Sequence, residues 1–207
     1  MAFDAFEKLP QEKKDRIINA GLEVFAAHEY KYASTDDMAA KAGISKGLLF
    51  YYFKNKREFY LYLLDYAKQL VANQVADRRF WEISDFFELM EYSARRKQEV
   101  LGRNPHWIDF SVRAFYTDGN EVAQPVADLT NQTMDGMIDL YFGNVDMTKF
   151  KPEVDPRDIL NMALWLTDGY MHQRQTMGQP VELEPLMAEF RKWLALLRQV
   201  AYKEEYL

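Results

Sequence analysis

Apolar positions near the start of the chain recur at the spacing of an amphipathic helix. Pro10 stands where a helix can begin, because its missing N–H costs nothing in the first turn. The positions after it follow the helical pattern i, i+3, i+4, i+7, i+8, and they are Ile17, Ala20, Gly21, Val24 and Phe25. This pattern predicts one helix that ends near His28.

Two short helices and one long helix are predicted next. Thr35 is read as the N-cap of a short helix with an acidic first turn, and Gly43 ends that helix. Ser45 caps a second short helix, which runs to about Phe53. Asn55 can cap a third helix of about twenty residues, in which the apolar positions at helical spacing are Phe59, Leu63, Tyr66 and Leu70.

The remainder of the chain keeps the helical period. Clusters of Gly, Pro, Asn and Asp separate the predicted helices, which span about 84–102, 105–117, 122–143, 156–177 and 184–203. No alternation of period two persists, so we expect no sheet. The sequence therefore predicts an all-α fold of about nine helices, with an N-terminal three-helix domain at 1–54 and a C-terminal helical bundle at 55–207.

Composition narrows the possible classes of protein. The 207 residues are 48% hydrophobic, which is typical of a globular chain. No run of about 18 apolar residues and no apolar signal core is present, so we expect a cytoplasmic protein with no membrane partner. The chain has no Cys, and its three His residues lie out of helical reach of one another. We therefore expect no metal and no cofactor, and the lack of nucleotide-binding glycine motifs and of a Glu-x-x-His pair argues against an enzyme.

Charge is distributed unevenly along the chain. The overall charge of −6 argues against a protein that coats nucleic acid. Residues 1–57 hold ten Lys and Arg against eight Asp and Glu, a balance of +2, and the remainder holds 16 against 24, a balance of −8. The N-terminal quarter is therefore the better candidate for a surface that faces phosphate.

The strongest local signal runs from Thr35 to Lys56. A capped helix, a tight glycine turn and a second capped helix follow one another without a spacer, which is the arrangement of a helix-turn-helix. The small Ala39 and Ala42 let the two helices approach closely, and Gly43 can take the left-handed conformation that the turn needs. The spacing alone fits a purely structural helical hairpin equally well.

The residue types of the second helix suit a nucleic acid. Ser45, Lys46 and Gly47 form its first turn, where free N–H groups and the positive end of the helix dipole favour a phosphate. In the aromatic run that follows, we expect Phe53 to pack inward and Tyr52 to present its hydroxyl to DNA. The alternative is that these residues are only packing aromatics and solvated lysines.

The stretch Ala40–Lys56, AKAGISKGLLFYYFKNK, closely resembles the signature of the TetR family of bacterial regulators. The resemblance covers about the first quarter of the chain, and it implies a dimer whose third helices enter successive major grooves of a palindromic operator. The family usually has Tyr where this chain has Phe50, and neighbouring Tyr51 can replace the missing hydroxyl. The DNA-binding residues that we expect are Thr35, Ser45, Lys46, Gly47, Leu48, Tyr51, Tyr52 and Lys56.

The resemblance also distinguishes roles among these residues. It implies that Lys46, Gly47 and Leu48 face the bases, and that Thr35, Tyr52 and Lys56 contact phosphates. Lys46 is the residue able to donate to guanine O6 or N7, while Leu48 can touch a thymine methyl group.

For the C-terminal bundle, the resemblance implies a ligand cavity. Aromatic and Met side chains often line adaptable apolar pockets, and our candidates for an effector pocket are Phe86, Trp107, Phe110, Met134, Met137, Trp165, Asp168 and His172. The same aromatic residues also fit an ordinary core. Asp168 and His172 lie four residues apart on one helix, where they can satisfy each other or orient an effector.

The resemblance further implies a dimer interface formed by the last two helices. The final predicted helix has a wide apolar stripe, and the helix before it is apolar nearly all round, which suits a segment packed on its own bundle and on a second subunit. The interface residues that we expect are Leu164, Met171, Met187, Phe190, Leu194 and Leu197. The alternative is a monomer with one large core.

Together these features predict a ligand-responsive DNA-binding transcriptional regulator. We expect a repressor that binds a palindromic operator as a homodimer and is released by a small, mostly apolar effector. The alternatives are a helical protein-interaction scaffold and a constitutive DNA binder without an effector.

Overall fold

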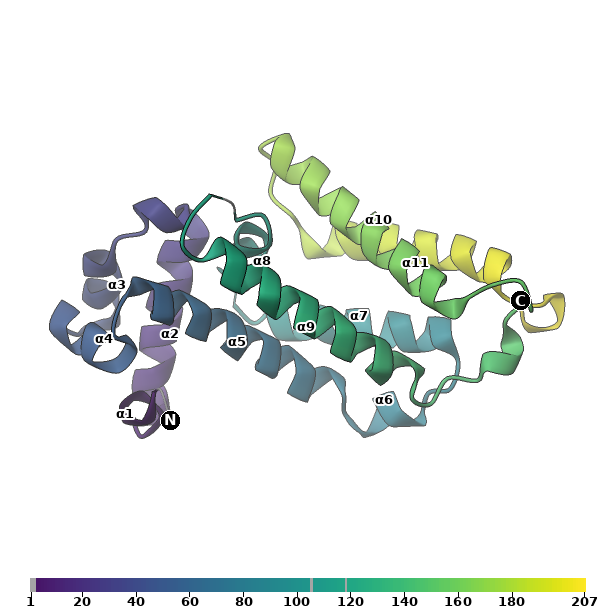
Figure 1. Ribbon diagram of the computed structural model, residues 1–207, viewed down its shortest axis with the longest axis horizontal. Helices are drawn as coiled ribbons and strands as arrows, with labels where there is room; N and C mark the ends of the chain where they lie inside the picture. Colours follow the sequence, from purple (N-terminus) through teal and green to yellow (C-terminus); the bar gives the residue numbers. More distant parts are fainter. Residues whose placement is uncertain (1–2, 105, 118) are drawn as a thin grey trace. The chain divides into compact units, whose positions relative to one another are not determined.

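The structure is a computed structural model, and it describes residues 3–104, 106–117 and 119–207, without the side chains of residues 134, 135, 137 and 139. These residues are mostly helical and contain no strand, apart from one isolated bridge between Phe150 and Tyr202 (Figure 1). The α-helices are α1 (Asp4–Glu7), α2 (Gln11–Ala27), α3 (Thr35–Ala42), α4 (Lys46–Phe53), α5 (Lys56–Val75), α6 (Arg78–Glu82), α7 (Phe86–Leu101), α8 (His106–Phe115), α9 (Ala123–Phe142), α10 (Pro156–Thr176) and α11 (Leu183–Ala201). The prediction of an all-α fold is confirmed.

Each of the nine predicted helices has a counterpart in the structure, and the described residues form two further α-helices, α1 and α6, that were not predicted. They have four and five residues, which is too short for an apolar position to repeat more than once. The prediction that Thr35 caps α3 is wrong. The cap is Ser34, whose hydroxyl accepts a hydrogen bond from the N–H of Asp37 at 3.2 Å, and Thr35 is the first helical residue.

The chain packs as two compact units. The first comprises residues 1–70 and 104–133, and the second comprises residues 71–103 and 134–207. The predicted division of function after residue 54 stays a prediction, because packing does not test it. None of the helices formed by the described residues has the length and hydropathy of a membrane-spanning segment.

In the first unit, α2 packs against both α3 and α8. The core between α2, α5 and α8 is aromatic: the ring centroid of Phe25 lies 4.8 Å from that of Tyr60, which in turn lies 5.1 Å from that of Phe110. Both contacts are close to edge-to-face, an arrangement that aromatic rings favour. The predicted core face of α2 is confirmed, because Ile17, Val24 and Phe25 are buried.

Helices α2 and α5 approach each other closely at Gly21. A Cβ at this position would lie 2.5 Å from a ring carbon of Phe59 and 2.9 Å from a methyl carbon of Leu63. We expect Gly21→Ala to lower the free energy of unfolding by about 1–3 kcal/mol, the usual effect of overpacking a core. Urea unfolding measures this change, and an unchanged or higher stability would contradict the tight packing.

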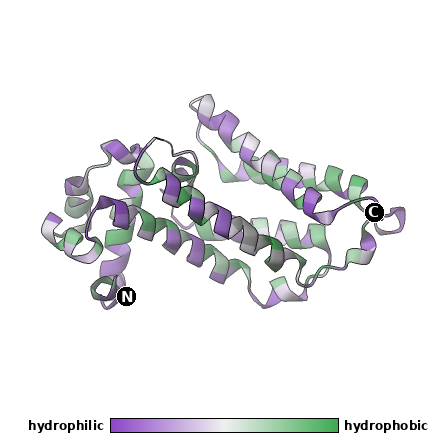
Figure 2. Cartoon of the chain, in the orientation of Figure 1, coloured by the Kyte–Doolittle hydropathy of each residue, from purple (hydrophilic) through white to green (hydrophobic). Residues whose placement is uncertain are grey.

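The second unit has a core built by α7, α10 and α11 together with the segment around Phe150. These helices are amphipathic, and Figure 2 shows hydrophobic and hydrophilic residues along both α7 and α11. Phe86, Phe87, Phe150 and Tyr202 are buried and pack in edge-to-face contacts. The apolar faces of these helices therefore form a common core.

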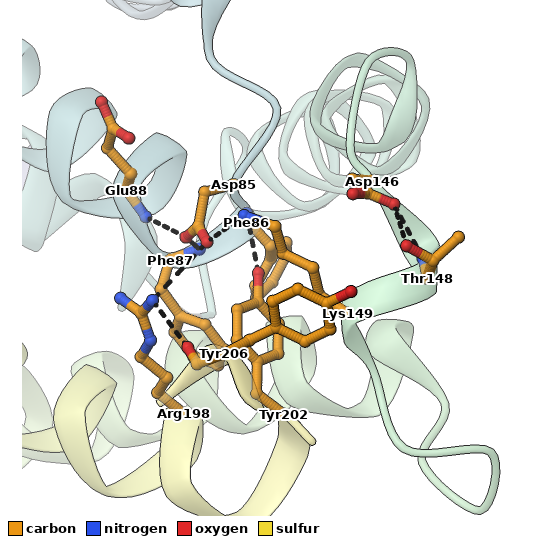
Figure 3. A network of polar contacts seen from close by, with 10 residues as sticks. All are labelled: Asp85, Phe86, Phe87, Glu88, Asp146, Thr148, Lys149, Arg198, Tyr202 and Tyr206. Atoms are coloured by element: carbon orange, nitrogen blue, oxygen red, sulfur yellow. Dashed lines mark hydrogen bonds and ion pairs between the residues drawn. The ribbon is translucent and has the colours of Figure 1, made fainter. Parts of the chain in front are cut away.

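A buried carboxylate joins three segments of the second unit (Figure 3). Asp85 caps α7 by accepting hydrogen bonds from the N–H groups of Phe87 and Glu88 at 3.1 and 3.0 Å. The Lys149 ammonium donates to it at 2.9 Å, and the Arg198 guanidinium lies 3.7 Å away. Burial alone raises the pKa of Asp85, but these cations and the Glu88 N–H outweigh burial and hold the pKa below its ordinary value.

Candidate nucleic-acid interface

The turn between α3 and α4 has the predicted geometry. Gly43 takes the left-handed conformation with φ +67°, and the N–H of Ile44 donates to the carbonyl of Ala39 at 3.0 Å. The Ser45 hydroxyl accepts from the N–H of Leu48 at 3.2 Å, which confirms Ser45 as the cap of α4. The turn therefore fixes the direction in which α4 leaves α3.

The outer side of α4 is exposed. Leu49 and Phe53 anchor the helix, because their side chains are only 1% and 0% exposed. The residues of α4 and its cap that are exposed are Ser45, Lys46, Gly47 and Tyr51. Leu48 is half-buried, as is Thr35 at the start of α3. Seven of the eight predicted DNA-binding residues, all except Tyr52, thus lie at least partly in solvent, and the residues grouped in the first turn of α4 form one accessible surface.

Lys46 is engaged in an ion pair within the chain. Its ammonium lies 2.8 Å from a carboxylate oxygen of Asp36, in the first turn of α3. Both side chains are well exposed, so the pair contributes at most about 1 kcal/mol. Lys46 can therefore leave Asp36 for another acceptor at little energetic cost.

Tyr52 is less available than the sequence predicts. The residue is only 7% exposed, and its ring packs against Phe6, with centroids 5.9 Å apart. The exposed ring on this helix is that of Tyr51, at 69%. A contact between Tyr52 and phosphate stays a prediction, and the packing shows that the ring also stabilises the back of α4.

The Lys56 ammonium is directed at the chain's own backbone. It donates to the carbonyl oxygens of Tyr30 at 2.7 Å and of Lys31 and Ala33 at 3.3 Å, and it lies 4.5 Å from the centre of the Tyr30 ring. Loss of solvent around Lys56 lowers the pKa of its ammonium, and the nearby Glu121 carboxylate partly opposes this effect. A phosphate contact by Lys56 stays a prediction.

The N-terminal residues that support α4 were missed by the sequence analysis. The Phe6 ring is fully buried, with its centroid 4.7 Å from that of Phe53 and 5.2 Å from that of Tyr62. Phe3 contacts the same two rings at 5.6 and 5.2 Å. The available signal was a pair of Phe residues three apart just before Pro10, which marks one face of a short helix.

The predicted effector residues fall in different parts of the fold. Trp107 and Phe110 belong to the first unit and are buried in its core, while Phe86 is buried in the core of the second. On α10, Trp165 is 67% exposed, Asp168 is half-buried and His172 is exposed. The side chains of Met134 and Met137 lie outside the described residues. An effector pocket formed by these eight residues stays a prediction.

Two concave sites occur elsewhere, and neither is lined by a predicted effector residue. A groove of about 670 Å³ runs along α1 and α5, and its walls include the four carboxylates of Asp4, Glu7, Glu58 and Asp65. A second site of about 460 Å³ lies between α7 and α11, beside Asp85 and Arg198. Both sites have charged walls, which do not resemble the apolar pocket that we expected.

Most residues predicted for a dimer interface face the core of their own unit. Met187 and Leu194 are buried, and Leu164, Phe190 and Leu197 pack against the core cluster. Met171 is half-buried. The opposite faces of α10 and α11 carry exposed large apolar side chains, which are Met162, Trp165, Leu166, Leu196 and Val200. A role of the six predicted residues in dimerisation stays a prediction.

Comparison with known proteins supports the interpretation of the N-terminal segment. Residues 17–63 match the family described as bacterial regulatory proteins, tetR family. The HTH-type transcriptional regulator SrpR of Pseudomonas putida is 42% identical over 48 residues, which are 23% of this chain and 22% of that protein. The match therefore spans about a fifth of the curated relative's length.

The fold as a whole is similar to solved structures of low sequence identity. The fatty acid degradation regulator FadR from Bacillus halodurans is 19% identical, with a TM-score of 0.71 over 87% of this chain and 96% of that one. FadR from Bacillus subtilis, solved in complex with stearoyl-CoA, is 20% identical, with a TM-score of 0.63 over 88% of this chain and 96% of that one. These likenesses show that the helical fold extends along most of the chain.

Proposed function

We propose that this chain, whose residues 17–63 match the family described as bacterial regulatory proteins, tetR family, is a transcriptional repressor that binds a palindromic operator as a dimer and is released by an effector. The observation that carries this proposal is the exposed first turn of α4. Ser45, Lys46 and Gly47 are accessible there, on a helix that Leu49 and Phe53 anchor from behind. Such a helix can enter a major groove without unfolding any part of the core.

The chemistry of this turn suits both phosphate and base edges. The free N–H groups at the start of α4 and the positive end of its dipole favour a phosphate oxygen. We propose that Lys46 leaves Asp36 and donates to a guanine, and that Leu48 contacts a thymine methyl group. We propose that Thr35 and Tyr51 contact phosphates, as positioning contacts without sequence preference.

A dimer provides the second recognition helix that a palindrome requires. We propose that the second copy of this chain covers the exposed faces of α10 and α11. Trp165 is the largest side chain on these faces, and large aromatic residues at the centre of an interface often dominate its binding energy. Two helices from each copy form a four-helix interface, in which the same surface is used twice.

Release from DNA by an effector is proposed as a shift between two arrangements of the chain. The effector is expected to be small and mostly apolar, as the many aromatic and Met residues beyond the DNA-binding domain suggest. FadR from Bacillus subtilis, which shares the fold, binds the acyl thioester stearoyl-CoA. Only the acyl chain of this ligand is apolar, and it makes compounds with a long acyl chain the first class to test.

Lys46→Ala tests the base contact. We expect this variant to weaken binding to the operator by about 1–3 kcal/mol, while its binding to unrelated duplexes changes much less. Fluorescence anisotropy at one fixed salt concentration measures both affinities, with the DNA that flanks the protein's own gene as the operator source. Lys41→Ala is a matched control, because Lys41 also forms an exposed ion pair, with Glu23 at 2.7 Å, at the other end of α3.

Equal operator affinity of Lys46→Ala and the unmodified protein would remove Lys46 from the base-contacting residues. An equal loss for operator and unrelated DNA would make it a phosphate contact instead.

A further inference from the structure

Four residues from three segments of the first unit form a polar cluster beside the helix-turn-helix, which we call the Glu121 lock: Tyr30, Lys56, Arg57 and Glu121. The Tyr30 hydroxyl donates to the Glu121 carboxylate, and the Arg57 Nε donates to the Glu121 backbone carbonyl at 3.4 Å. Glu121 lies between α8 and α9, 91 residues away from Tyr30 in the sequence. The lock therefore joins that segment to the DNA-binding domain.

Lys56 provides the other half of the lock. Residues 30–32 form a short 3-10 turn, η1 (Tyr30–Tyr32), between α2 and α3. The Lys56 ammonium donates to three carbonyls in and after this turn and has the Tyr30 ring on one side. An ammonium has three protons to donate, so these contacts can use its full capacity.

The Glu121 lock lies where it can affect the placement of α3 relative to α4, the two helices of the helix-turn-helix. Lys56 is the first residue of α5 and follows the end of α4 by three residues, whereas Ala33 precedes the start of α3 by two. The contacts of Lys56 thus tie the end of α4 to the beginning of α3. Glu121 holds the same turn through the Tyr30 hydroxyl.

We propose that Lys56 and Glu121 are positioning residues that hold η1, and through it α3, at the correct place relative to α4. In this role Lys56 acts on the backbone of its own chain and not on a DNA phosphate. Glu121 is then a residue outside the helix-turn-helix that controls DNA affinity without touching DNA. The proposal rests on the proposed function for its effect on DNA, but the contacts themselves can be tested without DNA.

A positioning role and a simple electrostatic role of Glu121 predict opposite changes in DNA affinity when its charge is removed. Removing a carboxylate makes the chain less negative, which by itself strengthens binding to DNA. Glu121→Gln keeps the size of the side chain but replaces a carboxylate acceptor with a weaker amide. If Glu121 positions η1, operator affinity should therefore fall although the repulsion of DNA is reduced.

The experiment combines amide hydrogen exchange with DNA binding. In Glu121→Gln, Tyr30→Phe and Lys56→Met, we expect the amides of residues 29–34 to exchange faster than in the unmodified protein. Exchange of these amides measures the stability of η1, in which the N–H groups of Tyr32 and Ala33 donate to the Glu29 carbonyl at 2.9 and 3.1 Å. Asp128→Asn, which removes an exposed carboxylate from α9, is the control and should leave this exchange unchanged. The melting temperature of each variant shows whether the whole domain has been destabilised.

The DNA arm separates a positioning lysine from a phosphate contact. We expect Glu121→Gln and Lys56→Met to weaken operator binding by about three- to thirtyfold, a range typical of residues that couple distant sites. The slope of log affinity against log salt concentration should stay the same in Lys56→Met. If Lys56 instead contacts a phosphate, the slope should become shallower by about 0.9.

Each outcome decides one part of the proposal. Unchanged exchange at residues 29–34 in all three variants would overturn the lock, and a shallower salt slope in Lys56→Met would return that residue to the phosphate contacts. Equal or tighter operator binding by Glu121→Gln would overturn its positioning role. If the unmodified protein binds no DNA, the proposed function fails, while the exchange arm still decides whether the lock holds η1.

Discussion

Trp165→Glu is expected to convert the dimer into monomers and to lower operator affinity by about two orders of magnitude or more. Trp165 is 67% exposed on α10, and in the proposed dimer it is covered by the second copy. A buried, unpaired carboxylate at each of two symmetry-related positions strongly disfavours association. A monomer reaches one half-site only and loses the gain of about 10²–10⁴ that linked binding sites provide. Light scattering measures the mass, and fluorescence anisotropy measures the affinity.

Trp81→Glu is the matched control for this prediction. Trp81 is also an exposed tryptophan, at 49%, but it lies on α6 and not on the faces of α10 and α11. The same change there should leave both the mass and the operator affinity unaltered. A dimeric Trp165→Glu protein, or two variants with equal loss of mass, would refute the proposed interface.

Asp85→Ala is expected to lower the free energy of unfolding by about 3–5 kcal/mol, the usual consequence of removing one partner from a buried charge cluster. The change removes the cap of α7 and leaves Lys149 and Arg198 without their carboxylate. Urea unfolding at neutral pH measures the loss. In the unmodified protein, the contribution of Asp85 to the free energy of unfolding should be complete at neutral pH. It should be lost in acid, as the pH falls below the ordinary carboxyl pKa of 3.8 and then through the lowered pKa that Asp85 has in the folded state.

Asp155→Ala separates the two parts of this effect. Asp155 also caps a helix, accepting from the N–H of Arg157 at 2.8 Å at the start of α10, but it is exposed. Its removal should lower the stability by about 1 kcal/mol, the value of a cap alone. If the Asp85 and Asp155 variants lose the same amount, the charged contacts of Asp85 add nothing to its cap.

The helices could be predicted from the sequence because their signals are local. The spacing of apolar residues in α2, and the order of Ser45 after Gly43 at the turn, depend only on neighbouring positions. The Ser34 cap was missed because Ser34 and Thr35 are both good caps and stand next to each other. N-cap propensity does not decide between two adjacent residues that are both favoured as caps.

The orientation of side chains around α4 could be predicted only in part. Four aromatic residues in a row must point in several directions, and periodicity alone does not show that Phe6 covers Tyr52. The contacts of Lys56 cross 23 to 26 residues and those of Glu121 cross 64 and 91. Such long-range contacts leave no pattern in a single sequence.

The same limit applies to the last two helices. The stripe that contains Phe190, Leu194 and Leu197 shows that α11 has an apolar side, but not what covers it. In the structure this side packs on the chain's own core, and the residues left exposed are others, such as Leu196 and Val200. Some residues of a wide apolar face can pack on the core while others form an interface, and only the three-dimensional structure shows which residues do which.

In the proposed complex, the exposed first turn of α4 enters the major groove of a palindromic site. A nuclease footprint of the protein on the DNA flanking its own gene tests this claim. We expect a protected inverted repeat whose half-sites are about one helical turn apart, or a multiple of it, with protection lost in Lys46→Ala at the same protein concentration. A footprint with no repeat symmetry, or one that Lys46→Ala reproduces in full, would contradict the claim.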